Sequence, residues 1–137
     1  HSPIFNQFEA LVIDENIGLQ DFMIMVREMA VRLYGKNVKM RVRPAYFPFT
    51  EPSIEIDATC QMCQGKGCTL CKGTGYSEFF GGGIVNPAIL EMSGIDSNKY
   101  SGFAFGPGID RSVMVTNKIP NIKYLFRNDL RFLKQMR

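Results

Sequence analysis

Residues 53–85, SIEIDATCQMCQGKGCTLCKGTGYSEFFGGGIV, decide the fold class of this chain. Both ends of the stretch, 53–59 and 76–85, contain the β-branched and aromatic residues that are typical of strands. The cysteine-rich residues 60–75 between them therefore predict a hairpin-like connection from one strand to the next. Strands that follow each other with few crossover helices are typical of an antiparallel sheet with helices on one side.

The rest of the chain extends this pattern in both directions. Alternation of apolar and polar residues predicts further strands over 4–14, 38–43 and 101–105. Helical spacing and capping residues predict helices over 19–33, 87–92, 109–116 and 128–136, the last capped by Asn128. We therefore expect an α+β fold: a mainly antiparallel sheet flanked by helices, with a small four-cysteine zinc knuckle inserted between two strands.

Composition and charge exclude several classes of protein. The 137 residues suit one domain, and 45% hydrophobic with 21% charged residues exclude a disordered chain. The 16 Lys and Arg against 13 Asp and Glu give a net charge of only +3, and the charges are too scattered to predict a nucleic-acid-binding patch. The longest apolar run, 22–26, is far shorter than the roughly 20 residues that span a bilayer. We expect a soluble domain with no membrane partner.

Four cysteines, Cys60, Cys63, Cys68 and Cys71, have the spacing C-x2-C-x4-C-x2-C. Two such pairs supply the thiolates of a tetrahedral Zn²⁺ site, and a closed four-sulfur site is structural because no position stays open for catalysis. The segment is also a repeat of period eight, CQMCQGKG followed by CTLCKGTG, with glycines where the backbone wraps close to sulfur. The alternatives are four reduced cysteines in a loop, or a redox C-x2-C pair, which should open a helix.

The stretch GFAFGPGIDR, which begins at Gly102, predicts a ligand site. Alternation leaves one strand face almost bare, with Gly102, Ala104 and Gly106, and a bare face weakens a strand unless something packs on it. A flat organic ligand is a candidate. The glycines lead into a helix whose first turn carries Arg111, and free N–H groups with a guanidinium favour phosphate. The alternative is a glycine-rich turn in which Asp110 holds Arg111.

The proline-stiffened stretch AYFPFTEP, residues 45–52, carries Phe47 and Phe49. Aromatic residues on such a loop more often pack into the core than bind a ligand. Here they are also placed to wall a pocket, where they would offer edge contacts to an aromatic guest.

Polar residues also occur where an apolar strand face is expected. Gln7 and Glu9 share one face of the first predicted strand, and a carboxylate that faces a pocket needs a cationic partner. A ligand ammonium group would satisfy Glu9, and so would Arg41 or Arg43 from another strand. Glu78, before a run of three glycines, is a reasonable Mg²⁺ ligand if phosphates lie nearby.

Longer motifs carry a resemblance to a known family. These motifs are FNQFEALVIDENI, VRPAYFPFTEPSIEID, GYSEFFGGGIVNP, YSGFAFGPGIDR and NDLRFLKQ. In register over essentially the whole chain, they resemble the catalytic α subunit of the bacterial phenylalanine–tRNA ligases, which are α2β2 class II aminoacyl-tRNA synthetases. The resemblance makes 1–137 a partial class II catalytic domain, running from the second half of motif 2 to motif 3. Residues 60–75 are then an insertion that some members carry.

The resemblance implies a function and an amino-acid site. The function is ATP-dependent activation of phenylalanine and its transfer to tRNA(Phe), in the cytoplasm and together with a β subunit. Gln7 and Glu9 match the positions that hold the α-ammonium group. Phe47 and Phe49 match the walls of the side-chain pocket, and Ala104 matches its floor.

The resemblance also implies a nucleotide site. Arg111 matches the motif 3 arginine on the ATP γ-phosphate, and His1 matches the motif 2 loop histidine near the α-phosphate. Glu78 occupies the place of an acidic residue associated with ATP and Mg²⁺. No side chain acts as a nucleophile, because the substrate carboxylate attacks the α-phosphorus and the site works by positioning and charge stabilisation.

The sequence departs from the family pattern at three positions. Asn6 and Asn86 stand where the family usually has His, and Ala10 stands where it has Gly. The two asparagines are the changes expected to disturb the site. Motif 1 and the first strand of motif 2 are expected before His1, where the sequence opens without a Met.

Two other functions stay open on the sequence alone. A non-catalytic, synthetase-like remnant would keep the zinc knuckle and an amino-acid pocket but would not bind an adenylate analogue. A zinc-ribbon adaptor, suggested by the CxxCxGxG repeat, would have no small-molecule pocket in which Phe47, Phe49 and Ala104 converge.

Overall fold

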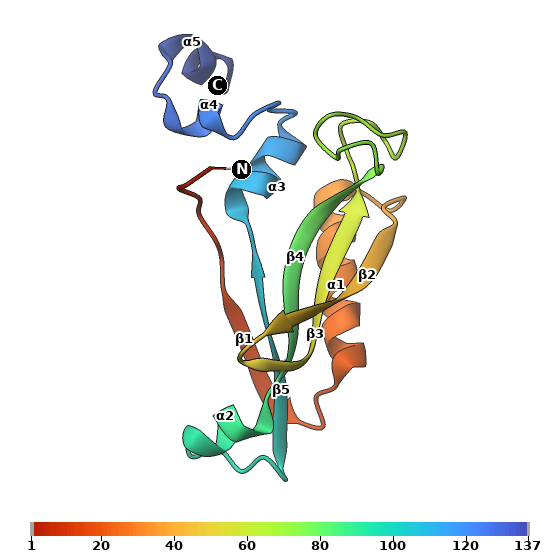
Figure 1. The fold of residues 1–137 in the computed structure, drawn as a ribbon, viewed down its shortest axis with the longest axis vertical. Coiled ribbons are helices and arrows are strands. Elements are labelled where there is room, and N and C mark those ends of the chain that lie inside the picture. The colour runs from red at the N-terminus through yellow and green to blue at the C-terminus, as the bar shows by residue number, and fades with distance from the viewer. Residues whose placement is uncertain (1, 137) are drawn as a thin grey trace.

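A computed structural model describes residues 2–136. Their strands form one five-stranded antiparallel sheet (Figure 1). The strands are β1 (Ala10–Glu15), β2 (Met40–Phe47), β3 (Thr50–Thr59), β4 (Tyr76–Val85) and β5 (Tyr100–Pro107). Their order is β1-β5-β4-β3-β2, so the cysteine-rich segment joins the neighbours β3 and β4, as predicted. The α+β class with an antiparallel sheet is confirmed.

Helices flank the sheet, and two of them have clear capping residues. They are α1 (Leu19–Tyr34), α2 (Pro87–Met92), α3 (Ile109–Thr116), α4 (Lys123–Phe126) and α5 (Leu130–Leu133), followed by a 3₁₀ turn at Lys134–Met136. The Gly18 N–H donates to the Asp21 carboxylate at 2.8 Å at the start of α1, and Gly35, at φ 90°, ends it. Asn86 caps α2, because its side chain accepts a hydrogen bond from the Ala88 N–H at 3.0 Å. No helix described between residues 2 and 136 is long and apolar enough to cross a membrane.

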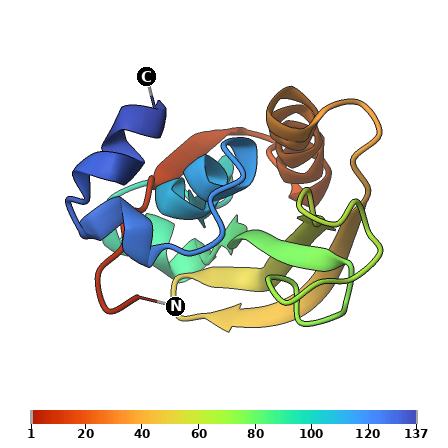
Figure 2. The same cartoon turned by 90° about the horizontal axis from the view of Figure 1, so that it is seen from above.

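The main core lies between α1 and one face of the sheet (Figure 2). Phe22, Val26 and Ala30, four residues apart on one stripe of α1, are fully buried. The ring of Phe22 packs against those of Phe103 and Phe105, with centroids 5.2 and 6.0 Å away. Each large side chain buried in this way contributes roughly 1.5–3 kcal/mol, so this contact fixes α1 on the sheet.

On the sheet face away from α1, β4 and β5 present a strip of almost bare backbone. Since Phe103 and Phe105 point toward α1, the alternate residues of β5, Ala104 and Gly106, point the other way. In the register of β4 and β5, Gly83 pairs with Ala104 and Gly81 pairs with Gly106. The bare face predicted for β5 therefore continues onto β4.

The prediction for the first strand is wrong in its extent. The predicted strand 4–14 is shorter: β1 begins at Ala10, and earlier only Gln7 pairs, in a bridge with Gly108. The reason is that β5 ends at Pro107 and turns into α3. The proline-containing stretch 45–52 comprises the end of β2, a turn at residues 48–49 and the start of β3. Pro44 is tolerated inside β2 because β2 is an edge strand.

The end of the chain also differs from its prediction. The single helix predicted over 128–136 is the short α5 and the 3₁₀ turn that follows it, and α4 was not predicted. Asn128 does not cap α5, because it adopts a left-handed conformation with φ 52°. The cap is Asp129, whose carboxylate accepts a hydrogen bond from the Arg131 N–H at 2.9 Å.

Candidate functional site

A cavity of about 200 Å³ lies over the glycine strip, and Gln7, Glu9, Phe47 and Phe49 are among its lining residues. The two aromatic rings, which come from the end of β2 and the turn after it, stack with centroids 6.1 Å apart and an interplanar angle of 21°. Gly81 makes room for them, because a Cβ there would lie 2.6 Å from Cζ of Phe47. One wall of the cavity is therefore aromatic, and its floor is backbone.

The polar pair lies directly over β5. Nε2 of Gln7 donates to the Gly106 carbonyl at 3.3 Å, and a Cβ at Gly106 would lie 2.5 Å from both this nitrogen and Oε1 of Glu9. Any larger residue at 106 would displace both side chains. Gly106 is thus the reason that an amide and a carboxylate reach the cavity side by side.

Glu9 forms no ion pair with any described residue, 2–136. Arg41 and Arg43, the partners considered from the sequence, bind other carboxylates on the neighbouring strands. The carboxylate is exposed and lines the same cavity as two aromatic rings, so it is free to bind a ligand ammonium group there.

Ala104 lies on the same sheet face but not among the residues that line this cavity. Its pairing partners are Gly83 on β4 and Leu11 on β1, one step along the sheet from the Gly81–Gly106 pair. Ala104 and Gly106 are two residues apart on β5, a distance of ~6.6 Å along the strand, so Ala104 lies beside the cavity. Ala104 and Phe49 therefore belong to one face of the sheet, although their side chains do not enclose the same space.

A charged ladder crosses β2 and β3, and the sequence analysis missed it. Asp57, with 4% of its side chain exposed, accepts hydrogen bonds from Arg41 at 2.7 Å and from Arg43 at 2.9 and 3.0 Å. Arg43 also pairs with Glu55 at 2.8 Å, and Arg41 lies over the ring of Tyr76, 4.9 Å from its centroid. Burial would raise the pKa of Asp57, but the two guanidinium groups outweigh it and hold this pKa below its ordinary value. The alternations R-x-R and E-x-D carried the signal, but only the register shows that they pair.

We expect replacement of Asp57 by asparagine to lower the free energy of unfolding at pH 7 by about 2 kcal/mol, because charged hydrogen bonds to a buried group are lost. The pKa of Asp57 is lower in the folded chain, so this stabilisation is present above the unfolded-state pKa of ~3.9 and disappears as the pH falls through the folded value. Urea unfolding at pH 7 and pH 3 measures both effects. The control is Glu55→Gln, whose side chain is 33% exposed and should contribute less than ~1 kcal/mol. Equal losses in the two variants at pH 7 would contradict the ladder's role.

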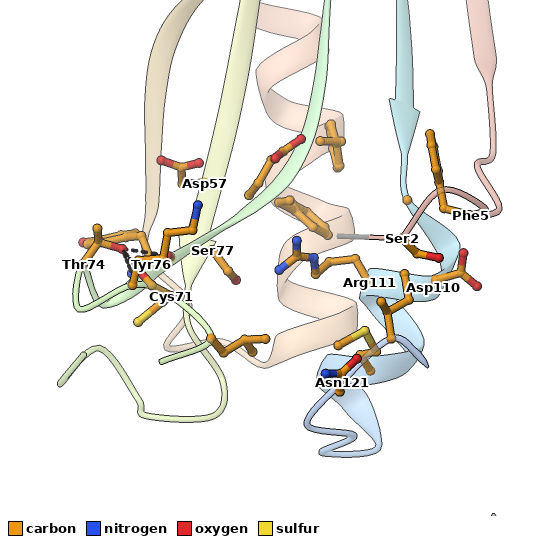
Figure 3. A pocket seen from close by; sticks show the side chains of 18 of the residues that line it. Ser2, Phe5, Asp57, Cys71, Thr74, Tyr76, Ser77, Asp110, Arg111 and Asn121 are labelled. Atoms are coloured by element: carbon orange, nitrogen blue, oxygen red, sulfur yellow. Dashed lines mark hydrogen bonds between the residues drawn. The ribbon is translucent and has the colours of Figure 1, made fainter. Parts of the chain in front are cut away.

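A larger cavity of about 940 Å³ lies between β4, α3 and the cysteine-rich segment. Figure 3 shows the side chain of Arg111 extending from the first turn of α3 into this space, toward Tyr76 and Ser77 on β4. Gln7, Glu78 and Gly106 line both this cavity and the smaller one. The two cavities therefore share one wall.

The start of α3 is held by the segment before β1. The Asp110 carboxylate accepts hydrogen bonds from the Asn6 N–H and, at 3.2 Å, from the Asn6 side chain, and the Ile109 N–H donates to the Asn6 carbonyl at 2.9 Å. Asp110 thus binds Asn6, and no ion pair joins it to Arg111 among residues 2–136. Asn6, where the family resemblance leads us to expect a histidine, is part of this anchor. His1, the other residue predicted for the nucleotide, lies outside the described residues.

The four cysteines converge on one point. All four Sγ atoms lie within 4.8 Å of one another, and the pairs Cys60–Cys68, Cys63–Cys71 and Cys68–Cys71 are 3.8, 3.8 and 3.7 Å apart. A tetrahedral site with metal–sulfur bonds of ~2.3 Å has edges of ~3.8 Å, so the donor set and its size fit Zn²⁺.

The period-eight repeat is visible in the backbone of this segment. Gln64 and Gly65 have positive φ of 51° and 85°, and their equivalents Lys72 and Gly73 have 51° and 80°. The N–H groups of Gly67 and Gly75 donate to Cys63 and Cys71 sulfur at 3.2 and 3.3 Å, again at equivalent positions. Each half thus turns around its own pair of sulfurs, and donated N–H groups favour the thiolate form.

Two of the thiols are electrostatically distinct. Burial raises the pKa of Cys60 to about 12. Burial would also raise the pKa of Cys71, but backbone N–H groups from Cys68 and Gly75 and the neighbouring thiols outweigh it and lower this pKa to about 6. The lowered pKa favours the thiolate form of Cys71, which is the form that binds a metal, whereas the raised pKa of Cys60 favours the thiol, whose proton a metal must displace.

Comparison with known proteins places the chain in a family. The family model of the class II tRNA synthetase core domain (F) matches residues 1–136. This chain belongs to the class II tRNA synthetase core family. The chain is 51% identical over 135 residues to a phenylalanine–tRNA ligase α subunit from Macrococcus caseolyticus, covering 98% of this chain and 38% of the relative. It is 50% identical over 137 residues to the same subunit from Staphylococcus haemolyticus, covering 100% and 39%.

The class II core assigned from the motifs is thus confirmed at the level of the family. The chain spans only about 39% of the length of relatives such as the Staphylococcus haemolyticus subunit. Gly106, which lines both cavities, is the last residue of GFAFG and lies in β5 just before α3 begins. The motif identified in the sequence therefore lies at the centre of the site.

Proposed function

We propose that the intact protein that contains this chain activates phenylalanine with ATP and transfers it to tRNA(Phe). It acts as a phenylalanine–tRNA ligase α subunit in an α2β2 assembly with a β subunit, in the cytoplasm. The observation that carries the proposal is the pair of adjoining cavities. One has an aromatic wall and the Glu9 carboxylate, the other has the arginine of α3, and they share Gln7, Glu78 and Gly106.

In this proposal phenylalanine occupies the smaller cavity. Its ring packs against Phe47 and Phe49, and its α-ammonium group binds Glu9 and Gln7. The carboxylate of the amino acid then points across the shared wall toward the larger cavity. The site needs no nucleophilic side chain, because that carboxylate attacks the α-phosphorus of ATP and pyrophosphate leaves. Positioning the two reactants supplies the acceleration.

ATP occupies the larger cavity in this proposal, with Arg111 on the γ-phosphate and His1 near the α-phosphate. Glu78 would hold Mg²⁺, which neutralises phosphate charge when it is bound, and its place on the shared wall suits that role. The four cysteines would hold a structural Zn²⁺ in the insertion 60–75. Residues 1–137 would then run from the second half of motif 2 to motif 3.

The test of this function is phenylalanine-dependent exchange of pyrophosphate into ATP by the intact protein with its β subunit. We expect exchange with phenylalanine and none with the other amino acids at equal concentration. Phenylalanine binding in calorimetry without exchange would instead support the non-catalytic remnant. Absence of both would contradict the proposed function.

Replacement of Ala104 by glycine tests the least central part of the proposed pocket. The family resemblance makes Ala104 the pocket floor, so the variant should accept para-substituted phenylalanines. Because Ala104 stands beside the cavity rather than in its lining, we expect a modest gain, on the order of the ~10-fold that a methylene-sized change commonly produces. The readout is kcat/KM for p-chlorophenylalanine against phenylalanine. An unchanged ratio would remove Ala104 from the specificity site.

A further inference from the structure

We propose that the four-cysteine segment is part of the nucleotide site, and that it places Lys72 so that its ammonium group binds the triphosphate of ATP. The inference rests on the proposed function, because it takes ATP as the occupant of the larger cavity. It gives the insertion a role in substrate binding rather than in folding alone.

The first observation is which half of the segment reaches the cavity. The residues of 60–75 that line the larger cavity all belong to the second repeat: Thr69, Leu70, Cys71, Lys72 and Thr74. In Figure 3 the side chains of Cys71 and Thr74 lie on one side of the space and that of Arg111 lies on the other. The segment therefore forms a wall across from α3.

The second observation is the charge that remains free in this cavity. Arg41 and Arg43 line it, but both bind Asp57. The Asp110 carboxylate binds Asn6. The remaining cations of the lining form no ion pair within the described residues, 2–136: Lys72, Arg111 and Lys123. In all, the lining carries five basic side chains, the three just named with Arg41 and Arg43, against the three carboxylates of Asp57, Glu78 and Asp110. This excess of positive charge favours a polyanion, and a cavity shared with a bound amino acid favours a triphosphate over an RNA strand.

The third observation is how the backbone holds Lys72. The residue has a left-handed conformation, φ 51°, directly after Cys71, and its N–H donates to the Thr69 carbonyl at 3.3 Å. A lysine rarely adopts this conformation unless its surroundings impose it. Here the turn between Cys68 and Cys71 imposes it, so a metal that binds the sulfurs also fixes where the Lys72 side chain begins.

The chain offers a matched control for this lysine. Lys66 is exposed and carries the same charge in the same segment, but it belongs to the first repeat and does not line the cavity. Lys72→Ala and Lys66→Ala therefore change net charge equally, but only Lys72 has a positive φ and lines the cavity. Lys72→Arg keeps the charge and should retain most of the affinity.

The test measures ATP affinity of the intact protein by equilibrium dialysis. We expect Lys72→Ala to weaken ATP binding about three- to fivefold, the effect of one exposed charge contact, with Lys66→Ala and AMP binding unchanged. In metal-stripped protein we expect wild type to weaken to the level of Lys72→Ala, with no further loss in that variant. Equal ATP affinity in the two alanine variants would overturn the inference, as would a change confined to the KM for tRNA. If phenylalanine-dependent exchange is observed with either of these results, the proposed function stands and only the role of Lys72 is contradicted. Failure of this inference can therefore be told apart from failure of the proposed function.

Discussion

Replacement of Gly106 by alanine should lower kcat/KM for phenylalanine about a hundredfold while the protein stays folded, since small displacements of positioning groups cost that much. The added Cβ would lie 2.5 Å from Nε2 of Gln7 and 2.5 and 2.8 Å from the two carboxylate oxygens of Glu9. These atoms are the ends of flexible side chains, so they move away and the backbone is spared. The loss should therefore fall on the ammonium site and not on stability.

Gly18→Ala is the matched control for this variant. A Cβ at Gly18 would meet its nearest neighbour, an Asp21 oxygen, at an ordinary 3.8 Å. Calorimetry with phenylalanine and thermal unfolding of both variants separate binding from stability. Normal phenylalanine affinity in Gly106→Ala would contradict the assignment of Gln7 and Glu9. A loss of thermal stability in that variant alone would show that Gly106 serves the fold instead.

Replacement of Cys71 by serine should remove stoichiometric zinc and unfold the segment 60–75 locally. Small four-ligand zinc sites contribute ~10–16 kcal/mol, and losing a ligand should cost more than the ~10–100-fold in affinity that follows loss of an outer partner. Six residues of the segment have positive φ, a conformation that costs energy for the non-glycine residues among them and that the metal site helps to hold: Gln64, Gly65, Gly67, Lys72, Gly73 and Gly75. Metal analysis and limited proteolysis measure the two effects.

Met62→Ser is the matched control, because Met62 lies between two ligands, is 38% exposed and donates no metal-binding atom to the cluster. Zinc affinity should also fall as the pH falls, because protons compete with the metal for the thiolates, above all for Cys60, whose pKa is raised by burial. A zinc-to-protein ratio well below one in the wild type, or unchanged proteolysis in Cys71→Ser, would contradict a zinc knuckle.

Local patterns were enough to predict most of the elements and the cysteine cluster. Helix α1 has a regular apolar stripe, and the cysteine spacing is typical of a metal site. Both features could be predicted because they depend only on residues that are close together in the sequence. The aromatic pair and the Gln7–Glu9 pair were also placed at a pocket from the sequence.

Features that depend on strand register could not be predicted in this way. The contacts of Asp57 with Arg41 and Arg43 arise only when β2 and β3 pair as they do. The position of Ala104 beside the cavity depends in the same way on the pairing of β4 with β5. Short helices such as α4 carry too few residues for a periodic pattern, so that helix was missed.

The most direct test of the central claim is a crystal structure of the intact protein with phenylalanine bound. We predict that the benzyl ring lies against Phe47 and Phe49, with the ammonium nitrogen within hydrogen-bonding distance of Glu9 and the carboxylate facing the larger cavity. Phenylalanine bound elsewhere, with the space over Gly106 filled by solvent or by a protein side chain, would contradict it.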